Sequence, residues 1–468
     1  MNSQKDVHEV PKWTSDRKAG GRMAKKQDLR IRSHAAHVRP GTDKQKKEKE
    51  TREKSISASR PDESEPDLVV LPRRKRKKRK VVLRVLSRLT IVAAIALAGF
   101  LVWRNWDRLA PENLVIWIEE KLSGKKNGRF PVEISGGTVL DLAEAKGNLA
   151  LLTDTALVMY NGSGAELTRR QHSYTSPVLK TYGDYILIAD TQGTRFRLET
   201  RASTLLNVVP SGTGQDSKDI TILDVPPTNR IVSAAVGKNG ITAFVTDSGQ
   251  SYTSEVLAYD KKGNNLLHRY NAELYGVDVA VSPDGKWIAV AGFAAQNGAI
   301  KSVVQVYSLA DAKAEIKEYA DTDILLCGIG YFPNGTLIAI GDTASWVINP
   351  NGSLFEKQTY ADRQLAAFTV GEDMASLVLH RYGSSAGGEL MMLTPAGNIA
   401  YREDFTGTFR ALAPSESGAL LLTSGKLYHA DAKGLGKASE VLQDGRLVCG
   451  VGKKAVVLGL TTLKAYTD

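Results

Sequence analysis

The sequence predicts an all-β protein, an eight-bladed β-propeller preceded by one transmembrane helix and a disordered basic tail. From residue 130 onward, short runs rich in Val, Ile, Leu, Tyr and Thr alternate with turns rich in Gly, Asn, Asp and Pro, as in all-β arrays. The pattern recurs at a mean step of about 44 residues, the size of a four-stranded blade. Upstream, a charge-free run follows a basic stretch. We therefore divide the 468-residue chain into a tail (1–80), an anchor (81–106), a linker (107–129) and a propeller (130–468).

The net charge of +11 belongs to the tail. Residues 1–80 carry about 25 Lys and Arg against about 12 Asp and Glu, roughly +13, which leaves about −2 for the rest of the chain. A mildly acidic propeller is poorly suited to phosphate backbones, so we expect no nucleic acid partner. Residues 1–72 lack periodic apolar residues and cannot bury enough surface to offset the entropy of ordering. We therefore predict that they are disordered.

The membrane anchor is predicted at residues 81–106. No charge occurs from Leu89 to Trp103, which gives about 22 Å of helix at 1.5 Å per residue. With the residues from Val81 onward and the interfacial pair Trp103 and Trp106, the segment reaches about 26 residues, enough to span a bilayer. A cleaved signal peptide fits less well, because the charged region before it is long and the apolar run continues past the possible cleavage site.

The residues directly before the anchor are all basic: Arg73, Arg74, Lys75, Arg76, Lys77, Lys78, Arg79 and Lys80. In a soluble protein this octet could be a nuclear-localisation or nucleic-acid patch. Beside a spanning helix, it predicts a cytoplasmic N-terminus and contact with anionic membrane lipid. The chain is then a single-pass protein of the cell membrane with an extracytoplasmic propeller. Residues 110–124 predict a short amphipathic helix that lies on the membrane, packs on the propeller or is a spacer.

The propeller repeat is clearest in the fourth and fifth blades, whose hairpins turn on PDG at 283–285 and PNG at 333–335, residues suited to positive φ. The innermost strands are predicted to begin near Val139, Val178, Ile231, Val277, Leu325, Leu365, Phe409 and Arg446. The last repeat holds only three strands, and Phe130–Ile134 can supply the fourth and close the ring, which removes an open edge. Seven blades are the alternative, with residues 203–230 as an irregular repeat.

Two resemblances agree with this architecture. The stretch SPDGKWIA resembles the repeats of bacterial propellers of the TolB and WD40-like kind. The basic stretch, the PENLVIWIEEKL helix, the FPVEISGG lead-in and the blades together resemble an uncharacterised family of bacterial single-pass membrane proteins, a family of unknown function. The second resemblance implies a tail, a signal anchor and an external propeller, and it implies no activity.

Motifs for catalysis or cofactor binding do not occur. HExxH, Walker and GxGxxG patterns are missing, and no GxSxG lies between a predicted strand and a predicted helix, as a nucleophile elbow requires. In the later blades His268, His380 and His429 stand alone, without carboxylates at fixed spacing. Cys327 and Cys449 lie in apolar runs, and we expect both thiols to be buried. The sequence therefore predicts no catalytic residue, no metal, no cofactor and no enzymatic activity.

Loop length suggests where the propeller binds. In a blade with strands A to D, the B–C and D–A connections lie on one face of the disc, which we call the B–C face. The A–B and C–D turns lie on the opposite face, which we call the A–B face. Most turns are tight, but residues 246–255, 293–302 and 380–389 form enlarged B–C connections. They carry aromatic and cationic groups suited to binding; tolerated insertions are the alternative. The predicted ligand- or partner-binding residues are Tyr252, Phe293, Gln296, Lys301, His380, Arg381 and Tyr382.

The sequence favours a membrane-anchored, extracytoplasmic and non-enzymatic scaffold that binds a protein or a cell-envelope ligand. Two alternatives stay open. One is a cell-envelope hydrolase or lyase that acts on sugars or peptides at the propeller channel, and the other is a transmembrane sensor that couples the propeller to the tail. If residues 130–134 close the ring, the linker from the anchor enters the propeller on the A–B face. The B–C face would then point away from the bilayer.

Overall fold

The computed structural model describes residues 88–90, 92–97, 99–100, 128–209, 220–249, 251–311, 313–350, 353–383 and 387–467. The chain divides into two units, Met1–Leu83 and Arg84–Asp468, and the first unit, with the basic octet, lies outside the described residues. The described residues between 88 and 100 have helical backbone. Within the described ranges, no helix is long and apolar enough to cross a membrane. The predicted anchor lies partly outside these ranges and stays a prediction.

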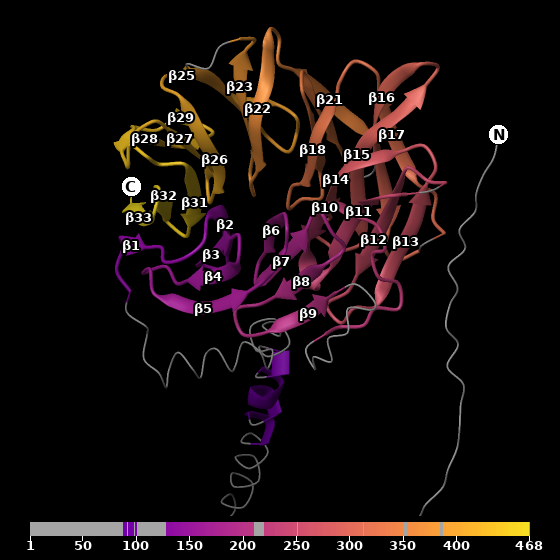
Figure 1. Cartoon of the computed structure of the whole chain (residues 1–468), viewed down its shortest axis with the longest axis horizontal. Coiled ribbons are helices and arrows are strands. Elements are labelled where there is room, and N and C mark those ends of the chain that lie inside the picture. The colour runs from indigo at the N-terminus through magenta and orange to yellow at the C-terminus, as the bar shows by residue number, and fades with distance from the viewer. Residues whose placement is uncertain are drawn as a thin grey trace, which may run out of the picture. The chain divides into compact units, whose positions relative to one another are not determined.

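Eight antiparallel sheets follow one another around a ring (Figure 1) and confirm the eight-bladed propeller. Every predicted innermost strand begins within two residues of the observed one. Blade 1 consists of β2 (Val139–Ala145), β3 (Asn148–Thr153), β4 (Ala156–Tyr160) and β5 (Glu166–Gln171). Blade 2 consists of β6 (Pro177–Tyr182), β7 (Tyr185–Asp190), β8 (Phe196–Glu199) and β9 (Thr204–Val208). Blade 3 consists of β10 (Ile231–Val236), β11 (Thr242–Asp247), β12 (Ser254–Tyr259) and β13 (Asn265–Asn271), with the short helix η1 (Lys238–Gly240) between its first two strands.

The other blades follow the same plan. Blade 4 consists of β14 (Tyr275–Val281), β15 (Trp287–Gln296), β16 (Ala299–Ser308) and β17 (Lys317–Asp321). Blade 5 consists of β18 (Leu326–Tyr331), β19 (Leu337–Gly341), β20 (Ala344–Ile348) and β21 (Leu354–Thr359). Blade 6 consists of β22 (Arg363–Val370), β23 (Ala375–Arg381), β24 (Gly388–Leu393) and β25 (Ile399–Phe405). Blade 7 consists of β26 (Phe409–Ser415), β27 (Gly418–Thr423) and β28 (Lys426–Asp431), and two short strands, β29 (Gly434–Leu435) and β30 (Ser439–Glu440), both pair with β28.

Blade 8 is closed by a strand from the other end of the propeller, as predicted. It contains β31 (Leu447–Val451), β32 (Lys454–Leu458) and β33 (Thr462–Thr467), and its outer strand is β1 (Val132–Glu133). Val132 pairs with Leu463 in the antiparallel ladder, and β1 lies beside β33 in Figure 1. Residues 132 and 463 lie near the two ends of the propeller sequence. Their pairing therefore closes the ring between the first and last blades.

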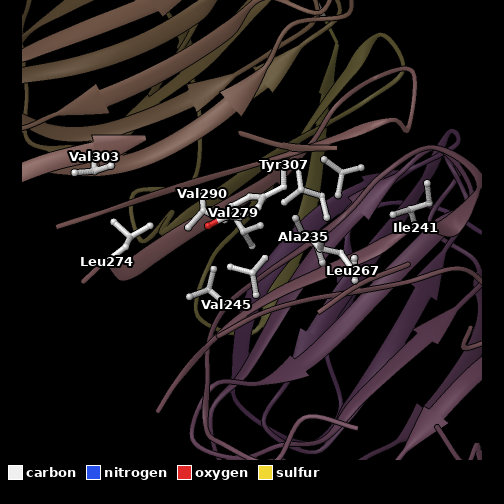
Figure 2. Packing of buried hydrophobic residues seen from close by; sticks show 14 of the residues in the cluster. Ala235, Ile241, Val245, Leu267, Leu274, Val279, Val290, Val303 and Tyr307 are labelled. Carbon is white, nitrogen blue, oxygen red and sulfur yellow. The ribbon is translucent and has the colours of Figure 1, made fainter. Parts of the chain in front are cut away.

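The core consists of layers between neighbouring blades. Successive side chains of a strand point to opposite faces of its sheet, so Ile288 and Val290 of β15 pack against blade 3, while Ala289 and Ala291 pack against blade 5. Figure 2 shows the layer between blades 3 and 4, where Val245 of β11 lies near Val279 of β14. Both faces of a blade are therefore apolar, which is why its second and third strands read as continuous hydrophobic runs.

Six of the eight innermost strands carry a β-bulge near their D–A end. The register between the first two strands shifts at this point in blades 1, 3, 4, 5, 6 and 7. The extra residues are Leu140, Val232, Val277, Cys327, Ala366 and Arg410. A bulge bends a strand and increases its twist, and here it recurs where the innermost strands approach the ring centre.

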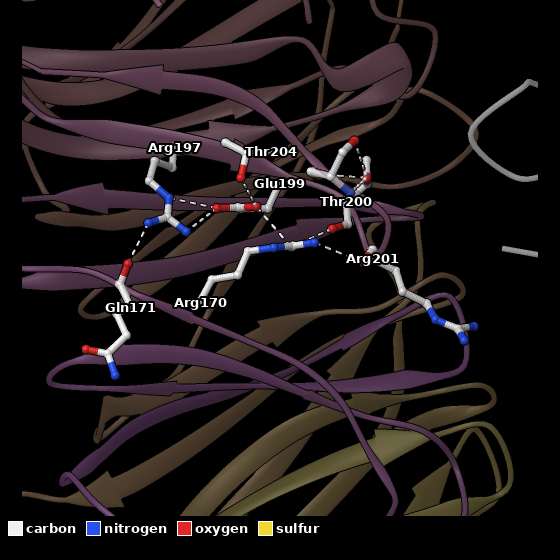
Figure 3. A network of polar contacts seen from close by, with 8 residues as sticks. Arg170, Gln171, Arg197, Glu199, Thr200, Arg201 and Thr204 are labelled. Carbon is white, nitrogen blue, oxygen red and sulfur yellow. Dashed lines mark hydrogen bonds and ion pairs between the residues drawn. The ribbon is translucent and has the colours of Figure 1, made fainter. Parts of the chain in front are cut away.

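A buried carboxylate joins blades 1 and 2 (Figure 3). The side chain of Glu199 is 0% exposed. It accepts hydrogen bonds from Nη1 of Arg170 at 3.0 Å, from Nε of Arg197 at 2.7 Å and from the Thr204 hydroxyl at 2.8 Å. Arg170 lies on β5, whereas Glu199 and Arg197 lie on β8. A buried charge is stable only when it is paired and hydrogen-bonded, and this network satisfies that condition across the blade boundary.

A second carboxylate joins three blades near the ring centre. Asp278 of β14 accepts the Ser233 hydroxyl of blade 3 on Oδ1 at 2.7 Å and the Ile329 N–H of blade 5 on Oδ2 at 3.0 Å. The bulge at Val277 is adjacent to Asp278. The three innermost strands are thus held in register by one half-buried side chain.

Candidate binding surfaces

The seven predicted binding residues all lie at the B–C ends of their strands, in two groups. Blades 3 and 4 carry Tyr252, Phe293, Gln296 and Lys301, and blade 6 carries His380, Arg381 and Tyr382. Blade 5 lies between the two groups. The propeller therefore places them on one face but does not gather them into a single site.

The enlarged connection predicted in blade 4 is wrong as a loop. β15 and β16 continue as a paired hairpin to Gln296 and Ala299, with only Asn297 and Gly298 at the turn. Both turn residues have positive φ, 52° and 79°, a backbone conformation that Asn and Gly accept readily. The Asn-Gly dipeptide could have shown this, because it is the pair that two-residue hairpin turns prefer.

The three predicted residues of this hairpin have different surroundings. Phe293 is half-buried and packs on the layer between blades 4 and 5. Lys301 lies 3.6 Å from Glu318, measured from Nζ to Oε1, and Gln296 is exposed at the tip. Phe293 therefore supports the hairpin, while Gln296 is accessible to a partner.

In blade 3, Tyr252 is part of an aromatic group that the sequence did not reveal. Its ring stacks on Tyr270 of β13, with centroids 4.5 Å apart and an angle of 20° between the planes. The His268 ring lies 4.6 Å from Tyr270 on the other side. His268 Nε2 bonds to the buried Glu255 carboxylate at 2.5 Å, and Thr246 donates its hydroxyl to the same carboxylate at 3.2 Å. The stacked tyrosines are thus held on a rigid polar base.

In blade 6, His380 faces inward and its two neighbours face solvent. The His380 ring meets Phe409 of blade 7 edge to face, with centroids 6.2 Å apart, and its Nε2 is buried without a hydrogen-bond partner among the described residues. Arg381 is exposed, and Tyr382 is 86% exposed. Arg381 and Tyr382 are therefore the accessible members of this group.

A group of exposed aromatic and aliphatic side chains lies on the B–C face of blades 3, 4 and 5. We call it the aromatic stripe, and its members are Tyr252 (43% exposed), Tyr270 (50%), Tyr275 (57%), Ile300 (64%) and Leu325 (45%). Tyr275 pairs with Phe293 in the β14–β15 ladder, so the stripe continues into the half-buried ring of that residue. Exposed apolar side chains that gather on one face are a feature of interaction sites.

Only one of the five stripe members was a predicted site residue. Tyr270, Tyr275, Ile300 and Leu325 occupy strand positions or the ends of strands, and their exposure depends on which end of a strand reaches the B–C face. Assigning strand directions from the closing strand would have placed Tyr275 and Leu325 on this face.

The prediction for the cysteines was correct for one residue. Cys449 is buried, but Cys327 is exposed, because it is the extra residue of the β18 bulge and its side chain leaves the core. Its sulfur still faces the protein on one side, and this partial desolvation and the nearby Asp342 charge raise the pKa of Cys327 above its ordinary value. Among the described residues, no three His, Cys, Asp or Glu side chains are arranged to hold a metal ion.

These features define a β-propeller with exposed aromatic and aliphatic side chains on its B–C face. The chain belongs to DUF5711, a family of unknown function, whose sequence pattern matches residues 218–455, just over half of the chain. The resemblance to an uncharacterised family with WD40-like blades is thereby confirmed. No curated protein matches the sequence.

Solved structures support the fold. The C-terminal WD40 domain of Sif2 has a TM-score of 0.50 at 14% identity, and the match covers 73% of this chain and 99% of that domain. Apo AztD from Citrobacter koseri has a TM-score of 0.44 at 12% identity, with 66% of this chain and 87% of that protein covered. At these identities the similarity to the Sif2 domain establishes a propeller fold and no function.

Proposed function

We propose that this protein is a membrane-anchored, extracytoplasmic scaffold without enzymatic activity, whose propeller binds a protein or a cell-envelope ligand on the B–C face. The observation that carries the proposal is the aromatic stripe. Tyr is enriched in binding hot spots, and the stacked pair Tyr252 and Tyr270 lies beside the hydrogen-bonded His268 and Glu255. A rigid aromatic surface loses little conformational entropy when a partner covers it.

The route of the chain supports the orientation of this face. The Gly128 N–H donates to Ser163 Oγ at 3.3 Å, and Ser163 lies in the C–D turn of blade 1, on the A–B face. β1 then leads from that face to the other. An anchor upstream of residue 128 is therefore joined to the propeller on the A–B face, and the aromatic stripe is turned away from the membrane.

The topology can be tested with the natural thiols. Cys327 and Cys449 are the two cysteines of the chain, and Cys327 is exposed. A membrane-impermeant maleimide, applied to intact cells at pH 8, should label Cys327 and leave Cys449 unlabelled. Labelling only after the cells are broken would place the propeller in the cytoplasm and overturn this part of the proposal.

Binding can be tested by site-specific photo-crosslinking of the full chain in its native membrane. A photoreactive amino acid at position 252, 275, 300 or 382 should give adducts that mass spectrometry identifies, and the combined change Tyr252→Ser with Tyr275→Ser should abolish those formed from position 300. Tyr182 and Ile399 are matched controls, since they are 38% and 40% exposed but lie at the A–B end of blade 2 and the C–D end of blade 6. Equal crosslinking from the control positions, or none from the stripe, would contradict the proposal.

A further inference from the structure

A cavity of about 200 Å³ lies on the A–B face, between blades 4 and 5. The A–B turns of both blades, the start of β17 and the C–D turn of blade 5 form its walls. Its lining includes three aromatic and three proline side chains, Trp287, Tyr319, Tyr331, Pro283, Pro333 and Pro350. Concave sites of this kind, mostly apolar with a few polar groups, are typical of ligand-binding sites. The cavity is on the opposite face from the aromatic stripe.

The aromatic side chains form a firm floor. Trp287 and Tyr331 are half-buried and pack on the layer between the two blades, and Lys317 Nζ lies 5.4 Å from the centroid of the Trp287 ring. Burial raises the pKa of Tyr331 and of Tyr319 above the ordinary value. Both hydroxyls therefore keep their protons at neutral pH and can donate hydrogen bonds.

Two of the side-chain acceptors of the cavity are engaged by the turns that build it, whereas Asp284 Oδ2 and Asn349 Oδ1 accept no hydrogen bond from a described residue. Asp284 Oδ1 accepts the Ser282 hydroxyl at 2.6 Å and the Lys286 N–H at 3.1 Å. In the equivalent turn of blade 5, Asn334 Oδ1 accepts the Thr336 N–H at 2.9 Å. These bonds close the two β-turns whose glycines have positive φ, so neither oxygen can turn toward a ligand without opening its turn.

The donors of the cavity remain available. Within the described part of the chain, neither the Tyr331 hydroxyl nor the Trp287 indole N–H has a hydrogen-bond partner, and the bond to Thr336 leaves the amide nitrogen of Asn334 free to donate. With the Lys317 ammonium, these donors outnumber the open acceptors Asp284 Oδ2 and Asn349 Oδ1, so the cavity combines aromatic rings with an excess of donors. A complementary ligand brings apolar rings and hydrogen-bond acceptors but few donors.

We propose that this cavity binds a proline-rich segment of a partner protein in the polyproline II conformation. Proline has no backbone N–H, and the carbonyls of a polyproline II helix make no internal hydrogen bonds, so such a segment offers acceptors alone. Its rings pack on aromatic side chains, and its stiffness reduces the entropy lost on binding. The indole N–H of Trp287 and the hydroxyl of Tyr331 donate to its carbonyls.

Calorimetric titration of the full chain with a blocked hexaproline peptide tests the proposal. A blocked peptide of six alternating Gly and Ser has the same length and charge but N–H donors and no rings, and we expect saturable binding of hexaproline only. Tyr331→Phe keeps the ring and removes one donor, so it should weaken binding by about 3- to 10-fold. Trp287→Phe should act in the same direction. Tyr275→Phe, on the other face, should leave the affinity unchanged, and equal melting temperatures show that the variants are folded.

Several results would overturn the proposal. They are equal binding of the two peptides, no binding of hexaproline, or hexaproline binding that Tyr331→Phe and Trp287→Phe leave unchanged. Tetramethylammonium or methyl glucoside bound at this cavity in place of hexaproline would assign it to a cation or to a sugar. Because the cavity and the stripe lie on opposite faces, the result of the peptide titration does not affect the photo-crosslinking test of the stripe.

Discussion

Replacing Glu199 by Ala should destabilise the propeller far more than replacing any surface carboxylate of the same blades. The change removes the shared partner of two guanidinium groups, those of Arg170 and Arg197, which are 18% and 13% exposed. Loss of one member of a buried ion pair costs about 3–5 kcal/mol, because the remaining charge is left uncompensated. Both arginines keep bonds to backbone carbonyls, Arg170 to Thr200 O and Arg197 to Gln171 O, so we expect the lower end, about 3 kcal/mol.

The assay is equilibrium unfolding of the full chain in urea, with the midpoint and the slope fitted separately. A lower midpoint at unchanged slope reports lost stability, whereas a changed slope reports a different unfolded state or separate unfolding of blades. Glu166→Ala is the matched control in blade 1. Its carboxylate pairs with Arg169, but the two side chains are 40% and 29% exposed, and such pairs contribute less than about 1 kcal/mol. Equal losses in the two variants would refute the view that the Glu199 network joins the blades.

Three further predictions concern single side chains. Asp278→Ala removes two hydrogen bonds to a half-buried carboxylate and should lower the free energy of unfolding by about 2–3 kcal/mol, measured by urea unfolding; an unchanged value would contradict the joint between three blades. Burial raises the pKa of Asp190, but the hydrogen bonds from the Ser176 N–H and from Arg195 lower it by more than burial raises it. The pKa of Asp190 therefore lies below the ordinary 3.8. A depressed pKa adds stability above pH 3.8 that is lost as the pH falls through the folded value, so Asp190→Asn should flatten the stability profile below about pH 4; a profile as steep as that of the natural protein would refute this. In the folded protein Cys327 alone should react with a disulfide reagent, and after unfolding both thiols should react. If neither thiol or both thiols react before unfolding, the assigned burial is contradicted.

The fold could be predicted because a propeller repeats itself. The step of about 44 residues and the turns at 283–285 and 333–335 located every blade, and the closing strand followed from the missing fourth strand of the last one. Both turns have the same physical basis, a Gly with φ of 72° or 85° behind an Asp or Asn that accepts from the backbone two residues on. Such local rules are visible in sequence. The bulges are not, because the extra residues, such as Val277 and Cys327, share no residue type.

The binding surfaces were harder to predict because they depend on which strands become neighbours. Tyr252, in the B–C connection of blade 3, stacks on Tyr270 of β13, and no sequence pattern joins the two residues. The cavity is formed by Trp287 of β15 and Tyr331 of β18, 44 positions apart along the chain and on different blades. The separation of these two residues equals the length of one blade repeat, and this signal was missed. Residues one repeat apart occupy equivalent positions on adjacent blades.

The two surfaces impose different demands on a partner if the proposed topology holds. The aromatic stripe, on the face turned away from the tether, is accessible to a large protein or to an envelope polymer without interference from the bilayer. The cavity lies on the face that carries Gly128 and Ser163, so its occupant must reach the side of the propeller that is joined to the anchor. A stiff, extended segment that projects from a neighbouring membrane protein meets that constraint better than a folded domain does, because a polyproline II helix extends about 3.1 Å per residue. Lengthening the linker between residues 107 and 128 should therefore alter capture of a membrane-tethered proline-rich probe and leave crosslinking at position 252 unchanged; an equal effect on both surfaces would show that the two faces do not differ in their access from the membrane.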